Sequence, residues 1–173
     1  MKKLTIVLAI IIVILSLNKQ EKVVMPKETI RFRVIANSNN EEDQNLKKQI
    51  VKNLESTISS IEYTPKDIET TRNNIKKELP KFSAIIEKTL KDQQVADKYT
   101  INYGMNYFPR KEYQGVVFEE GEYESLVVTL GDGLGENFWC ILFPPLCLLE
   151  QEETDQTEIE YTSFIQEVID KYF

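Results

Sequence analysis

Several residues whose types could do chemistry are gathered in one stretch of this chain, from Gly131 to Cys147. It holds three of the six glycines, the single tryptophan Trp139, and both cysteines, Cys140 and Cys147. Closely spaced glycines can cradle a phosphate, and two cysteines can form a redox centre, part of a metal site or a disulfide. Each of these possibilities makes a different demand on the residues around the stretch.

The glycines match a nucleotide-binding loop only in part. The pattern is Gly131, Gly133 and Gly135. A dinucleotide loop needs a following helix whose N-terminus faces the phosphate, whereas residues 137–142, NFWCIL, favour a strand. Asp132 and Glu136 would also repel a phosphate. We therefore expect a β-hairpin turn in which glycine supplies a positive φ, leading into a strand that carries Trp139 on the sheet or at its edge.

Cys140 and Cys147 lack the CxxC spacing of redox proteins, and the chain contains no histidine to complete a zinc site. A disulfide, stabilising by on the order of 2–3 kcal/mol, and two buried thiols are the leading alternatives, with a catalytic thiol as a third. Pro144-Pro145 lies between them and should end the strand, because proline lacks the N–H that a ladder needs. The disulfide requires a true chain reversal at this point.

The absence of histidine also removes the usual general base and any histidine-containing triad. The formal net charge is −7, and residues 150–173 carry eight acids and one lysine, which also sum to −7. Residues 1–149 are therefore neutral overall and offer no basic field to attract nucleic acid. We expect a protein partner, with no catalytic residues, metal or cofactor.

The N-terminus has the form of an export signal. Two lysines precede residues 4–17, an uncharged and largely apolar run. A helix of this length spans roughly 21 Å, short of the ~30 Å hydrocarbon layer. Because no small-x-small cleavage site follows, residues 1–22 are either a signal peptide or a membrane anchor. Residues 23–173 are expected to form a single exported α+β domain with an acidic C-terminal segment, touching the membrane only through the N-terminal segment.

Hydrophobic periodicity predicts the elements that must position the glycines and cysteines. Strands are expected at 30–36, 99–107, 116–118, 122–130 and 138–143, and helices at about 41–60, 66–78, 80–96 and 158–171. The first helix has two possible N-caps, Asn40 or a capping box of Ser38 with Glu41. The two middle helices are separated at Pro80, which is favourable in a first turn and unfavourable in a helix interior.

This order of elements predicts an α+β fold, an antiparallel sheet with helices packed on one face, preceded by the N-terminal export or anchor segment. Within the first strand, Phe32 and Val34 should face the helices, and Arg31 and Arg33 should point away from them. A slip of one residue would bury two guanidinium groups without partners.

Two long segments resemble the stage II sporulation protein R family. They are IRFRVIANSNNEEDQNLK, starting at Ile30, and EGEYESLVVTLGDGLGENFWCILFPPLC, ending at Cys147, with YFPRKEY between them. The resemblance implies a protein exported from the forespore into the septal intermembrane space. There it would activate the membrane-embedded protease that processes the sigma-E precursor, without being an enzyme itself.

The glycine stretch and the start of the first helix are then the surfaces expected to meet this protease. The candidate contact residues are Asn37, Ser38, Asn39, Asp132, Gly133, Gly135, Asn137 and Trp139. The alternative is a secreted hydrolase or a thiol-dependent envelope enzyme that uses Cys140, a Ser/Lys pair, or an acid pair such as Asp132 and Glu136. A third possibility is a structural protein of the envelope, which would self-assemble.

Overall fold

The computed structural model describes residues 22–96, 98–148 and 157–173. The predicted export or anchor segment lies outside these residues, as does most of the acidic run that precedes the last helix. No helix within the described ranges is long and apolar enough to cross a bilayer.

The elements follow the predicted order, with two short strands added. They are β1 (Val23–Val24), β2 (Ile30–Ile35), α2 (Glu41–Ser59), α3 (Ile68–Asp92), β3 (Tyr99–Phe108), β4 (Lys111–Tyr113), β5 (Val116–Phe118), β6 (Gly121–Leu130), β7 (Asn137–Phe143), the 3₁₀ turn η1 (Leu146–Leu148) and α4 (Glu158–Tyr172). The predicted α+β class is confirmed.

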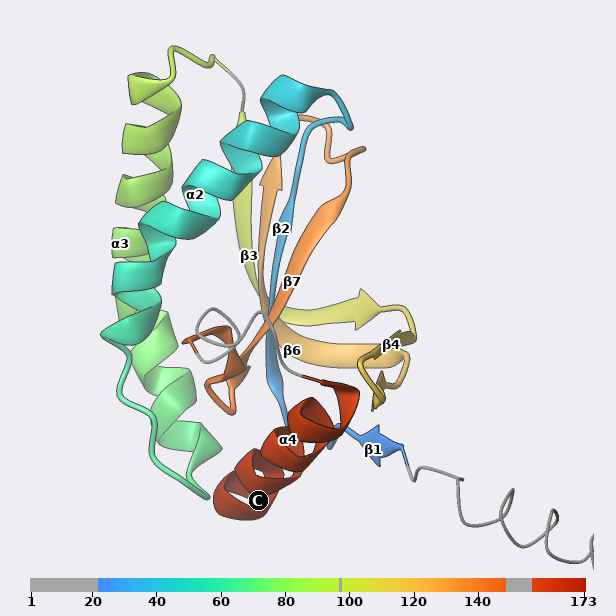
Figure 1. The fold of residues 1–173 in the computed structure, drawn as a ribbon. Coiled ribbons are helices and arrows are strands. Elements are labelled where there is room, and N and C mark those ends of the chain that lie inside the picture. The colour runs from blue at the N-terminus through green and yellow to red at the C-terminus, as the bar shows by residue number, and fades with distance from the viewer. Residues whose placement is uncertain (1–21, 97, 149–156) are drawn as a thin grey trace, which may run out of the picture.

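The larger sheet has the strand order β3-β6-β2-β7, and the smaller one β1-β5-β4. Each sheet contains one parallel pair, β2 with β6 and β1 with β5, so both sheets are mixed rather than wholly antiparallel. Figure 1 shows α2 and α3 together on one side of the larger sheet and α4 at its lower end, near β1. The lower halves of β3 and β6 bend away from the helices toward β4.

The core lies between the larger sheet and the helices. Phe32 and Val34 of β2 are 0% exposed, as are Leu54 of α2 and Phe82 of α3. The predicted alternation of β2 is confirmed for this face. Burying a phenylalanine or leucine side chain stabilises a fold by roughly 1.5–3 kcal/mol, so this face fixes the register of β2.

The predicted break at Pro80 is wrong, because α3 runs through it as one helix. Ile75, on one side of Pro80, and Phe82 and Ile86, on the other, are all fully buried, and their packing outweighs the hydrogen bond that proline removes. Pro80 and Lys76, the residue whose carbonyl loses its helical donor, lie on the exposed side, where water can replace that donor.

Helix caps are supplied by local side chains. Asn40 is the N-cap of α2, its Oδ1 accepting from the Asp43 amide at 2.7 Å, so the alternative box of Ser38 with Glu41 does not form the cap. Asp67 caps α3, and Thr157 with Glu160 forms a capping box at α4. An N-cap side chain of this kind stabilises a helix by about 1 kcal/mol.

Candidate functional site

Two loops far apart in the sequence meet at one end of the molecule, at the top of Figure 1: the turn after β2 and the loop between β6 and β7. The amides of Leu134 and Gly135 donate to the carbonyls of Asn37, at 3.0 Å, and Ala36, at 2.9 Å. The side chain of Asn37 accepts from the Asp132 amide at 3.0 Å. The structure therefore brings six of the eight candidate contact residues together: Asn37, Ser38, Asn39, Asp132, Gly133 and Gly135.

The glycines are needed because the two loops touch. A Cβ on Gly131 would lie 2.2 Å from Oδ1 of Asn37, and a Cβ on Gly135 would lie 2.3 Å from the carbonyl oxygen of Ser38. Gly131 and Gly133 also have positive φ, of +54° and +65°. The loop amides donate to the chain itself, so they are not presented to a phosphate as in a nucleotide loop.

The predicted β-hairpin is wrong, because β2 lies between β6 and β7 and pairs with both. The loop instead crosses over the end of β2, and strands on either side of a third are only about 10 Å apart, within reach of a short loop. Sequence periodicity identifies strands, but it does not say which strands are neighbours. The contact between Asn37 and Asp132 follows from this crossover.

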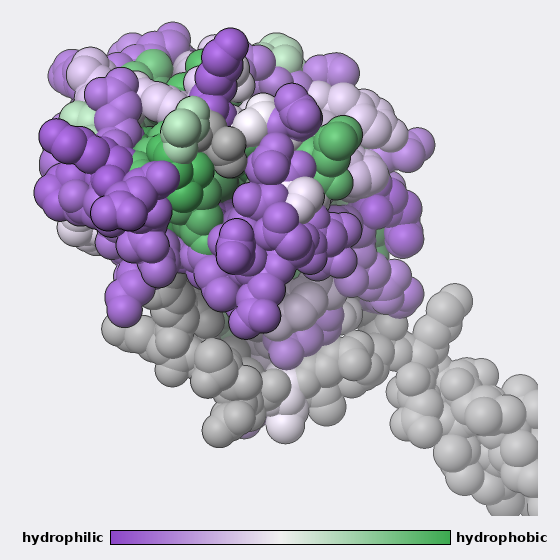
Figure 2. All heavy atoms as spheres, turned by 90° about the horizontal axis from the view of Figure 1, so that it is seen from above, coloured by the Kyte–Doolittle hydropathy of each residue, from purple (hydrophilic) through white to green (hydrophobic). Residues whose placement is uncertain are grey.

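Several candidate contact groups are used inside the protein. Asn37 donates to Asp43 at 3.0 Å, and Oδ1 of Asn39 accepts from the Glu136 amide at 2.6 Å. These asparagines therefore hold the two loops together. Asp132, Glu136 and Leu134 remain exposed, and Leu134 is 79% exposed. The view from above in Figure 2 shows a mostly hydrophilic surface with small apolar areas.

Lys47 also contacts the loop between β6 and β7, although the sequence analysis did not single it out. Its side chain is buried, and Nζ donates to Oε1 of Gln44 at 2.5 Å and to the carbonyl of Glu136 at 2.9 Å. Desolvation lowers the pKa of this ammonium. The helical spacing of Lys47 with Ile50, Val51 and Leu54 is the sequence signal that could have placed it on the inner face.

Cys140 and Cys147 form a disulfide, with Cα atoms 5.4 Å apart. As predicted, β7 ends at Phe143 and the chain reverses at Pro144-Pro145, which returns Cys147 to β7 through η1. Both cysteines are buried, and Cys140 shares the helix-facing side of the sheet with its partner Phe32. Neither sulfur is available as a free thiolate nucleophile.

Trp139 lies away from the two loops, on the face of the sheet opposite the helices, where it pairs with Arg33. Asn137 is on the same face, paired with Ile35, and its Oδ1 is buried without a hydrogen-bond partner. The candidate contact residues thus fall into two groups, one at the loop end and one on this outer face.

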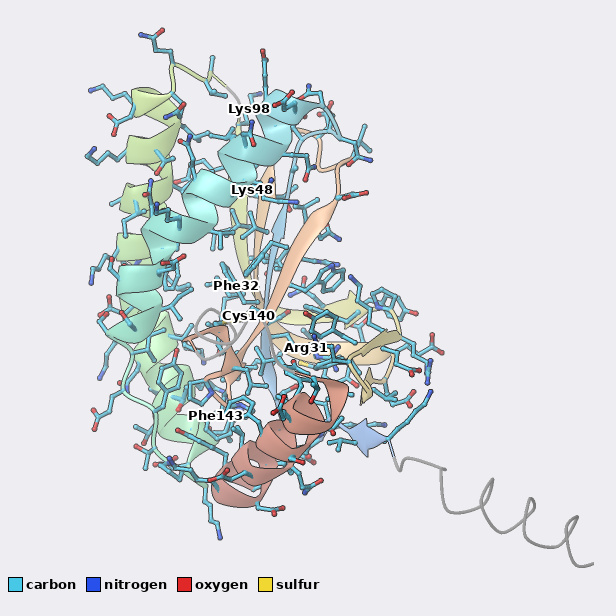
Figure 3. All side chains as sticks on the ribbon, viewed as in Figure 1. Arg31, Phe32, Lys48, Lys98, Cys140 and Phe143 are labelled. Atoms are coloured by element: carbon cyan, nitrogen blue, oxygen red, sulfur yellow. A yellow bond between two sulfur atoms is a disulfide. The ribbon has the colours of Figure 1, made fainter. Side chains whose placement is uncertain are left out.

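The outer face carries a set of cations and aromatic rings, here named the cationic cluster. Its members are Arg31, Arg33, Lys111, Phe108, Tyr123 and Trp139. The predicted direction of the arginines, away from the helices, is confirmed, and Figure 3 shows Arg31 on that side, next to the bent part of β3 and β6. Arg31 is nevertheless only 4% exposed, because this bend folds Phe108 and Tyr123 over it.

Distances within the cationic cluster indicate stacking of cations on rings. Cζ of Arg31 is 3.3 Å from the ring centroid of Tyr123, and Cζ of Arg33 is 5.0 Å from that of Phe108. Nζ of Lys111 is 4.3 Å from the ring centroid of Trp139. Desolvation lowers the pKa of all three cations. The alternation of arginines in β2 hinted at this site, whereas no local signal marks Lys111.

Comparisons with known proteins identify a family for this chain. The family model described as Stage II sporulation protein R matches residues 26–153. Stage II sporulation protein R of Bacillus subtilis (strain 168) is 33% identical over 163 residues, covering 89% of this chain and 73% of that protein. No solved structure matches. The matched residues include both loops, the disulfide and the cationic cluster, and the chain belongs to the stage II sporulation protein R family.

Proposed function

We propose that this protein is an exported sporulation signal that activates the membrane-embedded protease responsible for processing the sigma-E precursor. In this proposal it leaves the forespore and acts in the septal intermembrane space. The observation that carries the proposal is membership of the stage II sporulation protein R family over residues 26–153. A binding protein, rather than an enzyme, is the role that we assign to it.

The disulfide supports export. Cys140 and Cys147 are bridged inside the core, and such bonds form and persist in oxidising compartments outside the cytosol. The charged start and apolar run of residues 1–17 supply a route across the membrane, either as a cleaved signal or as a tether. Both features fit a protein that works beyond the membrane of the cell that makes it.

The alternative of a thiol-dependent enzyme loses its nucleophile, because Cys140 is bonded to Cys147 and buried. The acid pair proposed for a hydrolase, Asp132 and Glu136, is exposed. Burial is the usual means of tuning a carboxylate for acid or base catalysis, and neither of these residues has it. The structure therefore favours a surface that is recognised by another protein.

The exposed groups of the loop end, Asp132 and Leu134, are proposed to contact the protease, together with Trp139 on the outer face. Asn37 and Asn39 would act indirectly, by holding the loops in position. Gly133 and Gly135 would act in the same way, through the close approach that they permit.

The test is reconstitution of signalling in a host that does not sporulate. The full-length chain, the sigma-E-processing protease and the sigma-E precursor are produced together, and cleavage of the precursor is followed by immunoblotting. We expect cleavage to require the chain, and Asp132→Asn with Leu134→Ser to reduce it. Lys48→Gln, on the exposed side of α2, is the control. A protease that is competent under other conditions but does not respond to the chain would refute the proposed function.

A further inference from the structure

The cationic cluster has no acidic partner among the described residues. None of the ion pairs in residues 22–96, 98–148 and 157–173 includes Arg31, Arg33 or Lys111. Nearby carboxylates are held by other cations: Glu112 lies 2.5 Å from Lys22, and Glu119 lies 3.8 Å from Arg110. Three positive charges therefore share one site without a counter-ion from this part of the chain.

The donor groups of the two arginines are also largely unused. Nε of Arg31 and Nε of Arg33 are buried and have no hydrogen-bond partner. Arg31, 4% exposed, donates to the carbonyl of Glu119, at a long distance of 3.5 Å. A guanidinium has five N–H donors, and burying it is unfavourable unless these donors and the charge are satisfied. Stacking on Tyr123 and Phe108 compensates only part of this deficit.

The buried Nε atoms lie beneath the rings, but solvent reaches the half-buried Arg33 and the exposed Lys111, and there an oxyanion would supply the missing counter-charge and accept hydrogen bonds. A carboxylate accepts paired hydrogen bonds from a guanidinium and neutralises the neighbouring ammonium. We propose that the cationic cluster binds a carboxylate presented by an acidic segment of a partner protein, with Arg33 and Lys111 contacting it and Arg31 adding positive potential from beneath. The inference rests on the proposed function for the identity of that partner, which is the protease.

A protein segment fits this surface better than a membrane does. Clusters that bind anionic membranes usually contain 4–8 basic residues, whereas this site has three, and the neighbouring Lys22 and Arg110 are paired with Glu112 and Glu119. Tryptophan, tyrosine and arginine together are typical of the residues that dominate protein interfaces.

The strand next to the cationic cluster gives a second reason to expect a protein segment as its ligand. β7, which carries Trp139, pairs with β2 alone among the described strands and is therefore an edge of its sheet. An extended segment can lie along such an edge and place an acidic side chain over the cluster.

Trp139 is the only tryptophan, so its fluorescence reports occupancy of the site directly. The full-length chain, held in phosphatidylcholine vesicles, is titrated with an acetylated peptide containing three adjacent aspartates and with its asparagine counterpart. We expect a saturable change with the aspartate peptide alone. Loss of one charged hydrogen bond should weaken that binding by about tenfold in Arg33→Gln and in Lys111→Gln.

Matched variants separate binding from folding. Lys111→Arg should keep the affinity, and Lys48→Gln, an exposed cation on α2, should leave it unchanged (Figure 3). Circular dichroism establishes that each variant is folded. Equal responses to the two peptides, or wild-type affinity in both glutamine variants, would overturn the proposal. So would a response obtained only with inorganic phosphate, or only after phosphatidylglycerol is added to the vesicles.

The cleavage assay identifies the partner. If Arg33→Gln loses both peptide binding and stimulation of precursor cleavage while Lys48→Gln retains both, the protease is the source of the carboxylate. If Arg33→Gln loses peptide binding but stimulates cleavage fully, the protease is excluded as that source and the proposal is overturned. If the wild-type chain stimulates no cleavage, the proposed function fails, and the peptide titration still decides whether the cluster binds carboxylates.

Discussion

Removal of the disulfide offers a quantitative test of how the end of β7 is held. Cys140 and Cys147 are separated by seven positions and tie the edge strand to η1, which contacts α2. The perturbation is the double variant Cys140→Ala with Cys147→Ala, in which no thiol remains to be oxidised or exchanged. Alanine is chosen because a buried serine hydroxyl would add an unsatisfied donor.

The expected size of the effect follows from the length of the closed loop. Restricting the unfolded chain by a bridge across seven positions stabilises the fold by about 2.4 kcal/mol in the chain-entropy treatment. Loss of the buried sulfur atoms adds a smaller packing penalty, since both cysteines are less than 9% exposed. We expect the free energy of unfolding to fall by about 2–4 kcal/mol.

Urea unfolding followed by far-UV circular dichroism measures this difference. Trp139 fluorescence is a poor probe here, because Trp139 is adjacent to Cys140 and responds directly to its chemical state. Wild-type protein reduced with dithiothreitol is the control, since it lacks the bridge but keeps both sulfur atoms. A loss of less than about 0.5 kcal/mol in both samples would refute the argument and would mean that packing alone holds η1 against β7.

Three further changes test other parts of the fold by the same unfolding measurement. Gly135→Ala should destabilise the fold by about 1–3 kcal/mol, because the added Cβ would meet the Ser38 carbonyl. If this variant is as stable as the wild type, the two loops can separate freely. Pro80→Ala should stabilise α3 by about 1–3 kcal/mol by restoring a helical hydrogen bond, and a loss of stability would mean that the proline ring makes a needed contact. Although burial raises the pKa of Glu124, hydrogen bonds from Arg72 and Tyr103 outweigh it and hold that pKa below its usual value. The stability that the ion pair of Glu124 with Arg72 contributes should therefore be fully present above the unfolded-state pKa of about 4.3. It should fall as the pH drops through the folded-state pKa of Glu124, and Glu124→Gln should remove this part of the pH dependence. If the free energy of unfolding of Glu124→Gln depends on pH as it does in the wild type, this prediction is contradicted.

The parts of the fold that periodicity predicted are those with a long, one-sided apolar pattern. α2 and the strands of the larger sheet belong to this group, and their ends lie within about one residue of the predicted ends, whereas α3 was predicted as two helices, 66–78 and 80–96. β1 and β4 were missed because they are short and largely exposed, whereas the equally short β5 was found from its buried apolar residues, Val116 and Val117. The continuation of α3 through Pro80 was missed because its cause is burial on both sides of the proline, which depends on α2.

The candidate site also divides into features that the sequence predicted and features that depend on tertiary structure. The glycines, cysteines and arginines were identified by type and spacing, but their roles depend on which strands are neighbours. Placing β2 between β6 and β7 turned an expected hairpin into a crossover and gave Asn37 a structural role. Burial of Arg31 depends on the bend of β3 and β6, which has no signature in the sequence of β2.

β2 connects the two surfaces that are proposed to contact a partner. One face of this strand holds Phe32 and Val34 in the core, the other presents Arg31 and Arg33, and its C-terminal end leads into the turn that Asn37 fixes against the glycine loop. Because successive side chains alternate, a shift of β2 by one residue would move the arginines into the core and displace Asn37 from Asp132 at once. The buried phenylalanine therefore positions both surfaces. Mutations in this core should weaken signalling only as far as they unfold the protein, whereas changes at Arg33 or Lys111 should weaken it in a folded protein.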